Sequence, residues 1–208
     1  MTGSAPLRID DDHWLRRVRR RPSPNCDARG AGERPELVVI HCISLPPGRF
    51  GTGFVAALFE NRLDPDSDPA LADLRGVEVS AHLFVDRRGR VTQFVPFDRR
   101  AWHAGVSAWR GRPACNRYSI GIELEGTETG RYTRAQYRTL DRVLRALFAR
   151  YPGLAPDAIV GHQEIAPGRK RDPGPGFDWR RVLLGLAVSR MREDRDPVRG
   201  ALPRWRLD

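Results

Sequence analysis

One short run of residues places the strongest constraint on the fold of this chain. The segment Leu37-Val-Val-Ile-His41 is apolar up to its final histidine, and polar and proline-rich stretches bound it on both sides. Continuous apolar runs of this length are typical of strands that are buried on both faces of a sheet. We therefore predict a central strand that ends at His41.

Strand and helix signals alternate along the rest of the chain. Residues 80–85 and 91–95 are strand-like runs on either side of a glycine turn, which predicts a hairpin, and residues 119–125 alternate with period two. Thr133-Arg-Ala-Gln136 is a capping box, and apolar residues follow it at helical spacing as far as Tyr151. Further predictions are helices at 52–61 and 179–191, a short helical turn at 14–18 and a buried strand at 158–161. The pattern predicts an α/β fold, a single domain with a mixed central β-sheet flanked by helices.

The length and the terminal composition indicate how the chain is divided. A chain of 208 residues can bury a core of its own and leaves little room for a second domain. We predict an N-terminal arm at residues 1–21, a domain at 22–191 and a basic C-terminal tail at 192–208. Cys26, Cys42 and Cys115 form no close pair, and no apolar run has the length of a signal peptide or a membrane span. These features predict a cytoplasmic protein with no membrane partner. No long apolar surface is predicted to be exposed, so we also expect a monomer.

The charge of the chain is strongly positive, with 36 Lys and Arg against 26 Asp and Glu. Such an excess suits a nucleic-acid partner, which remains one alternative. The basic stretches at 16–21 and 190–206 also hold or adjoin acidic residues, however, so we predict a solvated basic surface and no nucleic-acid partner. Lys170 is the only lysine, and every other basic residue is arginine.

Two of the five histidines lie at the ends of predicted apolar strands, directly before loops, where open sheets display functional side chains. His41 ends the first strand, and His162 follows the strand at 158–161. Glycines and prolines stiffen residues 168–176, a loop that can bring Asp172 beside the strand ends. Two imidazoles and a carboxylate are a known ligand set for catalytic zinc, although each histidine alone is more often structural. His82 is interpreted as structural.

Eight segments in consistent order, between about residues 22 and 180, carry a resemblance to a known family. They are residues 39–48 (VIHCISLPPG), 79–82 (VSAH), 95–98 (VPFD), 101–107 (AWHAGVS), 119–126 (SIGIELEG), 161–170 (GHQEIAPGRK), 172–175 (DPGP) and 177–179 (FDW). The chain resembles the AmpD family, the zinc-dependent cytoplasmic amidases of cell-wall recycling within the wider amidase_2 and peptidoglycan-recognition superfamily. The resemblance implies a zinc amidase domain at 22–191. It also implies hydrolysis of the amide between 1,6-anhydro-N-acetylmuramic acid and L-alanine in an anhydromuramyl-peptide, with Zn²⁺ as cofactor.

The resemblance also implies roles for individual residues. The implied zinc ligands are His41, His162 and Asp172, the catalytic pair is Glu123 and Lys170, and the substrate-binding residues are Trp102, His103, Cys42 and Asn116. Glu123 would take a proton from water and pass it to the leaving amine, while Lys170 and zinc would stabilise the oxyanion. Without the resemblance, Glu123 and Glu125 are equal candidates, because both face the same side of their strand.

Three departures from the family pattern concern the substrate. Family members have asparagine at the position of Cys42 and arginine at the positions of Glu78 and Ala114. Arginine there would suit the carboxylates of a stem peptide, and we expect other arginines, at 75, 112 or 117, to be candidates for replacing it.

The alternative function is a non-catalytic muropeptide-binding module of the same fold. A binding module needs neither the three ligand positions nor Glu123 and Lys170, so their presence favours an enzyme.

Overall fold

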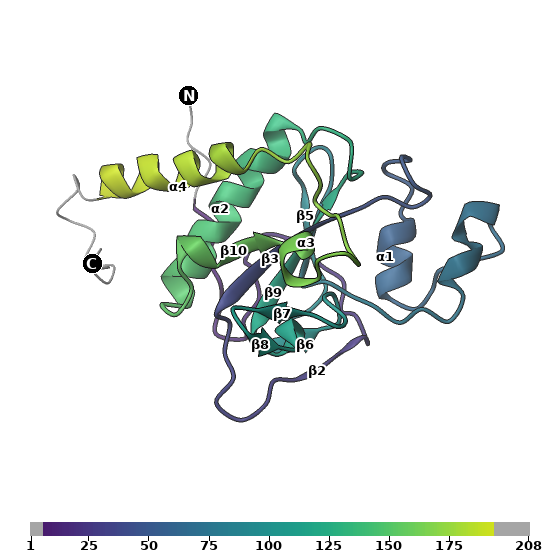
Figure 1. Cartoon of the computed structure of the whole chain (residues 1–208), viewed down its shortest axis with the longest axis horizontal. Coiled ribbons are helices and arrows are strands. Elements are labelled where there is room, and N and C mark those ends of the chain that lie inside the picture. The colour runs from purple at the N-terminus through teal and green to yellow at the C-terminus, as the bar shows by residue number, and fades with distance from the viewer. Residues whose placement is uncertain (1–5, 194–208) are drawn as a thin grey trace.

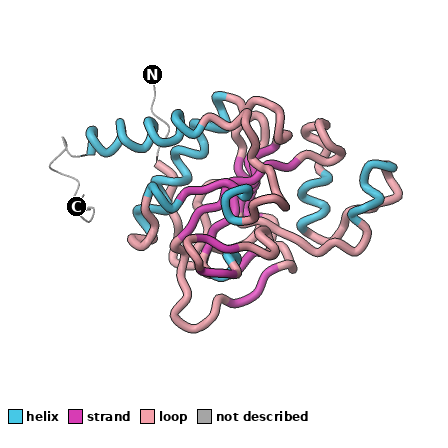
Figure 2. Tube along the Cα trace, in the orientation of Figure 1, coloured by secondary structure: helices cyan, strands magenta, loops and turns pink. Residues whose placement is uncertain are grey.

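A mixed six-stranded sheet forms the centre of the computed structural model, which describes residues 6–193 (Figures 1 and 2). In spatial order its strands are β1 (Arg19–Arg20), β5 (Val91–Gln93), β4 (Leu83–Val85), β9 (Ser119–Glu125), β3 (Leu37–Ile43) and β10 (Ile159–Gly161). Neighbouring strands are parallel except for the antiparallel pair of β4 and β5. The predicted fold class is confirmed.

Four helices, three 3₁₀ turns and two short strand pairs complete the fold of the described residues. The helices are α1 (Phe54–Phe59), α2 (Arg134–Arg150), α3 (His162–Ile165) and α4 (Trp179–Glu193), with 3₁₀ turns η1 (Pro69–Leu74), η2 (Cys115–Arg117) and η3 (Pro156–Ala158). Two antiparallel pairs, β2 (Cys26–Ala28) with β6 (Arg99–Ala101) and β7 (Ala108–Trp109) with β8 (Arg112–Pro113), lie outside the main sheet. In Figure 1, α4 lies across α2 at one end of the molecule, and α1 lies at the other. None of the helices in residues 6–193 has the length and apolar character needed to cross a membrane.

The prediction of a central buried strand is confirmed. β3 pairs in parallel with β9 on one side and β10 on the other, and its first five residues are buried. The strand continues two residues past His41, to Ile43, so the predicted end at His41 is wrong. The continuation arises because Cys42 and Ile43 still pair with Leu124 and Glu125 of β9.

The predicted helical turn at residues 14–18 is also wrong. His13 and Arg17 both have φ of 62°, which no right-handed helix contains. Leu15 forms an isolated bridge with Ile9, and its fully buried side chain joins the core. With β1 paired to β5, this part of the predicted arm is built into the fold. The predicted tail at 192–208 lies, from residue 194 onward, outside the described residues.

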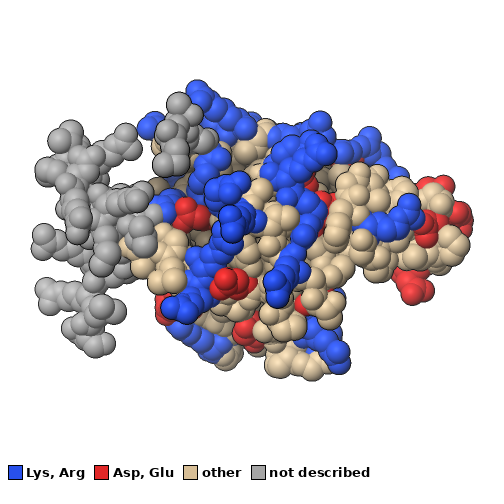
Figure 3. Space-filling view, turned by 90° about the horizontal axis from the view of Figure 1, so that it is seen from above, with Lys and Arg blue, Asp and Glu red and all other residues tan. Residues whose placement is uncertain are grey.

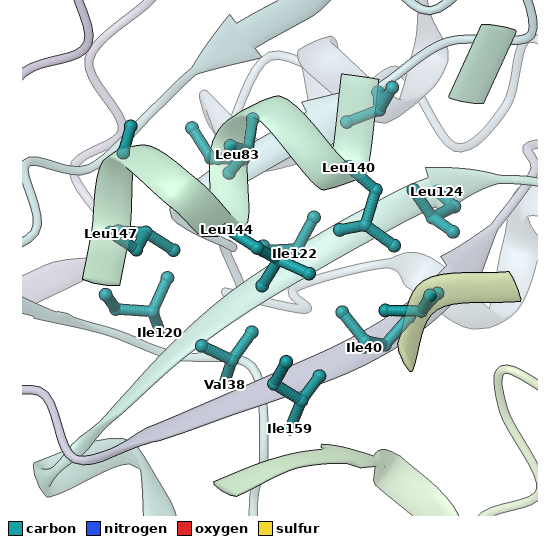
Figure 4. Packing of buried hydrophobic residues seen from close by; sticks show 14 of the residues in the cluster. Val38, Ile40, Leu83, Ile120, Ile122, Leu124, Leu140, Leu144, Leu147 and Ile159 are labelled. Atoms are coloured by element: carbon teal, nitrogen blue, oxygen red, sulfur yellow. The ribbon is translucent and has the colours of Figure 1, made fainter. Parts of the chain in front are cut away.

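Helix α2 covers one face of the sheet and closes the larger core. Leu140, Leu144 and Leu147 of the helix lie against apolar side chains of the central strands (Figure 4). The strand residues shown there include Val38, Ile40, Ile120, Ile122 and Ile159. Because side chains alternate along a strand, the residues between them, including His41 and Glu123, face the opposite side.

The capping box at the start of α2 is present as predicted. Thr133 Oγ1 accepts a hydrogen bond from the Gln136 backbone N–H at 3.1 Å, and Gln136 Oε1 accepts one from the Thr133 N–H at 3.0 Å. The Thr133 hydroxyl also donates to the backbone oxygen of Arg87, at 2.9 Å, so it ties the helix to the β4–β5 turn.

Replacing Thr133 should therefore weaken the fold. We expect Thr133→Ala to lower the free energy of unfolding by about 1 to 2 kcal/mol, as for other lost N-caps, in urea denaturation. Thr133→Ser keeps the hydroxyl and is the matched control, with an expected loss below about 0.5 kcal/mol. Equal unfolding midpoints for Thr133→Ala and the unmodified chain would contradict this role of the cap.

Candidate metal centre

Two neighbouring strands deliver the three predicted metal ligands to one point. His41 lies on β3, and β10 pairs beside it with Gly161 opposite Ile40, so His162, the next residue, emerges next to His41. The loop that follows returns Asp172 to the same point, where the Gln163 N–H donates to the Asp172 backbone oxygen at 3.0 Å. The three side chains form a group that could hold a metal ion.

The three candidate donor atoms are in mutual contact. His41 Nδ1 lies 3.0 Å from His162 Nδ1 and 3.0 Å from Asp172 Oδ2, and His162 Nδ1 lies 3.1 Å from the same carboxylate oxygen. The residues are 1%, 3% and 7% exposed. Two imidazole nitrogens and one carboxylate oxygen match the donor set of a catalytic zinc site, which keeps a further position open.

The protonation of these atoms also fits a cation. His162 Nε2 lies 3.1 Å from the Ala104 carbonyl oxygen, which only accepts, and 3.4 Å from Arg169 Nη2, which only donates. The shorter contact favours a proton on Nε2 and a lone pair on Nδ1 that faces the other two candidate ligands. Burial lowers the pKa of His41 to about 4, so this ring is neutral at pH 7. Burial alone would raise the pKa of Asp172, but the contacts with His162 and His41 outweigh it and hold that pKa well below its ordinary value. Three electron-rich atoms therefore share at most one proton.

Glu123 lies beside His41 across the β3–β9 pairing, on the same face of the sheet. Its Oε2 is buried and has no hydrogen-bond partner among residues 6–193. Burial raises the pKa of the Glu123 carboxyl well above its ordinary value and the Asp172 carboxylate raises it further, while Lys170 opposes the shift. An unpaired carboxyl beside the candidate ligands is suited to exchanging protons with a substrate.

The second strand candidate, Glu125, is already occupied. Its Oε1 accepts from the Gly51 N–H at 2.5 Å, and its Oε2 accepts from the Arg87 N–H at 2.9 Å. The two carboxylates face the same side, as predicted, but Glu125 supports two loops, whereas Glu123 Oε2 has no such partner within residues 6–193.

Lys170 is exposed, on the loop between α3 and Asp172. Its backbone N–H donates to the Ala166 carbonyl at 3.0 Å. Its ammonium has no ion-pair or hydrogen-bond partner within the described part of the chain, although its charge acts on Glu123 and His41.

The four predicted substrate-binding residues occupy different environments. Trp102 is half-buried, and its backbone N–H donates to Ser80 Oγ at 3.2 Å. His103 lies directly against His41. Asn116 Oδ1 accepts from the N–H groups of His103 and Ala104, at 3.2 and 2.8 Å, so it braces this loop. Cys42 packs against the α2 side of the sheet, and burial raises its pKa to about 12. Substrate contact by these four residues stays a prediction.

The three arginines considered as replacements, because Glu78 and Ala114 depart from the family pattern, are all paired with acidic residues. Arg75 pairs with Asp66 at 2.5 Å, Arg112 with Glu36 at 2.6 Å and Arg117 with Glu33 at 2.5 Å. A stem-peptide carboxylate would have to compete with these acidic partners for any of the three.

Two arginines that support the centre were not predicted. Arg169 Nη2 donates to the backbone oxygens of Ala104 and Val106, at 2.6 and 2.7 Å, and so holds the loop whose carbonyl faces His162. Its position next to Lys170 is the feature of the sequence from which Arg169 could have been predicted. Arg29 donates to four backbone oxygens beneath the site, those of residues 97, 116, 117 and 119, and burial lowers its pKa to about 10. Nothing in the sequence distinguishes Arg29 from the other arginines.

A cavity of about 980 Å³ lies elsewhere, and of the site candidates named above its lining contains only Glu125. Its lining is electropositive and includes Arg8, Arg16, Arg17, Arg19, Arg21, Arg90 and Arg142, with Asp86 and Glu125 as its acidic members. Basic side chains also gather over the middle of the face in Figure 3, with acidic ones among them. The volume of this cavity does not make it the candidate catalytic site, because the candidate metal ligands His41, His162 and Asp172 and the carboxyl of Glu123 lie outside it.

The chain is similar to known amidases over most of its length. The profile of the Amidase_2 family, described as N-acetylmuramoyl-L-alanine amidase, matches residues 31–175. The 1,6-anhydro-N-acetylmuramyl-L-alanine amidase AmpD of Salmonella typhimurium strain SL1344 is 52% identical over 185 residues, which cover 89% of this chain and 98% of that protein.

Solved structures agree with this similarity. A crystal structure of a Se-Met AmpD derivative superposes with a TM-score of 0.83 at 51% identity and covers 86% of this chain and 98% of the other. The amidase AmiD from Escherichia coli, solved with the substrate anhydro-N-acetylmuramic acid-L-Ala-D-γ-Glu-L-Lys, has a TM-score of 0.55 at 29% identity, over 86% of this chain and 65% of the other.

The unpaired carboxyl of Glu123 should reduce the stability of the metal-free protein in a pH-dependent way. A pKa that is raised in the folded state means that stability is lost as the pH rises above the unfolded value of 4.5. We expect metal-free Glu123→Gln to unfold at a higher urea concentration than the unmodified chain at pH 8, with no advantage at pH 4.5. Glu125→Gln is the control and should instead lose stability at pH 8, because the carboxylate that accepts from two backbone N–H groups is gone. A pH-independent effect of Glu123→Gln would contradict this account.

Proposed function

The chain belongs to the Amidase_2 family and, within it, to the AmpD group of amidases, and we propose that it is a zinc-dependent N-acetylmuramoyl-L-alanine amidase. The proposed substrate is an anhydromuramyl-peptide, and the bond cleaved joins the lactyl carbonyl of 1,6-anhydro-N-acetylmuramic acid to the nitrogen of L-alanine. The proposed setting is cell-wall recycling in the cytoplasm, with the chain as a monomer.

One observation carries this proposal. The buried group of His41, His162 and Asp172 lies beside a buried carboxyl oxygen of Glu123 that has no partner among the described residues. An unpaired buried polar atom is costly to retain, and such atoms are typical of sites that act on a ligand. A module that only recognises muropeptides would not need this arrangement.

The protein residues divide the chemistry of hydrolysis. Glu123 would accept a proton from the attacking water and return it to the alanine nitrogen as the C–N bond breaks, which leaves a carboxyl group on the lactyl carbon and a free amine on the peptide. A carboxyl whose pKa is raised can perform both transfers near neutral pH. Lys170 brings a positive charge toward the carbonyl oxygen, where negative charge develops.

The candidate ligands His41, His162 and Asp172 would hold zinc. A bound zinc ion supplies Lewis acidity, since it acidifies water toward a pKa of about 7 and polarises a carbonyl oxygen. The Ala104 carbonyl fixes the tautomer of His162 for this purpose, and Arg169 holds that carbonyl in place.

Hydrolysis can be tested directly with anhydromuramyl-tripeptide. We expect the purified chain to release free tripeptide, to hold one zinc per chain by elemental analysis, and to lose turnover with a strong chelator. Asp172→Ala should lose both zinc and turnover. Glu123→Ala should keep zinc and lose turnover by a factor of about 10² to 10⁴, the usual contribution of a general base.

Other outcomes of this assay would change the proposal. Absence of release under every metal loading would overturn the amidase, and tight binding of the unhydrolysed peptide in that case would support the binding module instead. Turnover that survives in Glu123→Ala would assign the base to a different residue.

The lone lysine gives a separate prediction. Lys170→Met should fold normally and lower kcat by a factor of about 10² to 10³, as when one oxyanion donor is removed. Lys170→Arg should also lower kcat, because a planar guanidinium does not present its charge and donors as a compact ammonium does. The neighbouring exposed Arg171 offers the control Arg171→Lys, with unchanged kcat expected. Full activity of Lys170→Met would remove Lys170 from the catalytic machinery.

A further inference from the structure

The side chain of His103 links a candidate metal ligand to the body of the fold. His103 Nδ1 lies 2.9 Å from His41 Nε2, and His103 Nε2 lies 3.1 Å from Ser119 Oγ. His41 turns its other nitrogen, Nδ1, toward His162 and Asp172. A chain of hydrogen bonds therefore runs from the candidate metal position through two imidazoles to the hydroxyl of Ser119, a fully buried residue.

We propose that His103 is a positioning residue for the metal centre, which sets the orientation and the tautomer of His41. The inference rests on the proposed zinc site. Metal-ligating histidines usually donate their second N–H to a carboxylate, a backbone carbonyl or water. In this chain a second imidazole takes that place, and Ser119 in turn orients the second imidazole.

The hydrogen-bond chain can run in either direction. When His41 Nδ1 serves as a ligand, its Nε2 carries the proton and donates to His103 Nδ1, and His103 Nε2–H donates to Ser119 Oγ. In the metal-free protein the reverse order is satisfied, with Ser119 donating to His103, His103 to His41 and His41 to Asp172. Both rings are neutral in either order, so the ligand nitrogen becomes available by tautomer exchange and the links of the chain stay paired.

Packing also fixes the position of the ring. A Cβ atom on residue 121 would lie 2.5 Å from His103 Cγ, so only glycine at that position of β9 leaves room for the imidazole. Asn116 holds the backbone on the other side, since its Oδ1 accepts from the N–H groups of His103 and Ala104. The ring therefore occupies a slot shaped by the strand and by η2.

His82 provides a natural comparison. Its ring centroid lies 5.8 Å from that of His103, but it has no contact with His41. His82 Nδ1 accepts from the Gly121 N–H at 3.0 Å, and its Nε2 faces the Arg99 carbonyl at 3.0 Å. It is a buried histidine at the same site whose hydrogen bonds lead away from the metal ligands.

The test is the zinc affinity of the full chain, measured by competition with a chromophoric chelator. We expect His103→Leu to weaken zinc binding about 10- to 100-fold, as for other lost supporting contacts. His103→Asn should remain within about threefold of the unmodified chain, because its amide oxygen replaces Nδ1 as acceptor. His82→Asn, which keeps the acceptor for Gly121, should likewise stay within about threefold.

A spectroscopic readout adds to the affinity measurement, and a milder variant keeps the test independent of the folding of His103→Leu. The visible bands of the Co²⁺-substituted protein should change in His103→Leu and be restored in His103→Asn. Ser119→Ala removes only the far end of the chain and should weaken zinc binding severalfold. If His103→Leu fails to fold, unchanged zinc affinity in Ser119→Ala overturns the proposal.

Two further results would also overturn it, namely wild-type zinc affinity in a folded His103→Leu, or an equal loss in His103→Asn and His103→Leu. Failure of the amidase proposal can be told apart from failure of this inference. If the chain hydrolyses no muropeptide but its zinc affinity depends on His103, this inference stands. Hydrolysis with zinc affinity indifferent to His103 would overturn this inference alone.

Discussion

The parallel register of three strands is the constraint on which the candidate centre depends. β3 aligns His41 with Glu123 of β9, and its pairing with β10 places Gly161 beside Ile40, so that His162 follows at the same edge. A shift of one residue in either pairing would turn a side chain to the α2 face, into an apolar core. The core packing that fixes this register, between α2 and the apolar residues of the strands, therefore also positions the chemistry.

Burial gives the centre its electrostatic character. Donor atoms that share at most one proton lie in contact, and the adjacent Glu123 oxygen has no partner among the described residues. The surrounding polar side chains, by contrast, form hydrogen bonds with backbone atoms. Ala104 faces His162, Arg169 holds Ala104, and Asn116 braces the same loop. A rigid and paired frame around a few unpaired groups is the arrangement expected of a preorganised site.

The sequence predicted the elements whose signal is continuous, and it missed those that depend on distant partners. The apolar run at 37–41 and the capping box at Thr133 predicted β3 and α2, because burial and capping are local in sequence. The pairs β2–β6 and β7–β8 contain two or three residues per strand and have no periodic signal. Residues 14–18 mimic a helical turn in composition, but left-handed backbone conformations at His13 and Arg17 exclude one.

The same division holds at the site, where strand ends and family resemblance indicated the ligands, but neither could show that Glu125 is occupied or that His103 contacts His41. The most direct test of the central claim is the zinc K-edge X-ray absorption spectrum of the zinc-loaded chain. We predict nitrogen and oxygen donors alone at about 2.0 to 2.2 Å, with two imidazoles in the outer scattering. A sulfur donor at about 2.3 Å, or the absence of imidazole scattering, would contradict the assignment of His41, His162 and Asp172 as the ligands.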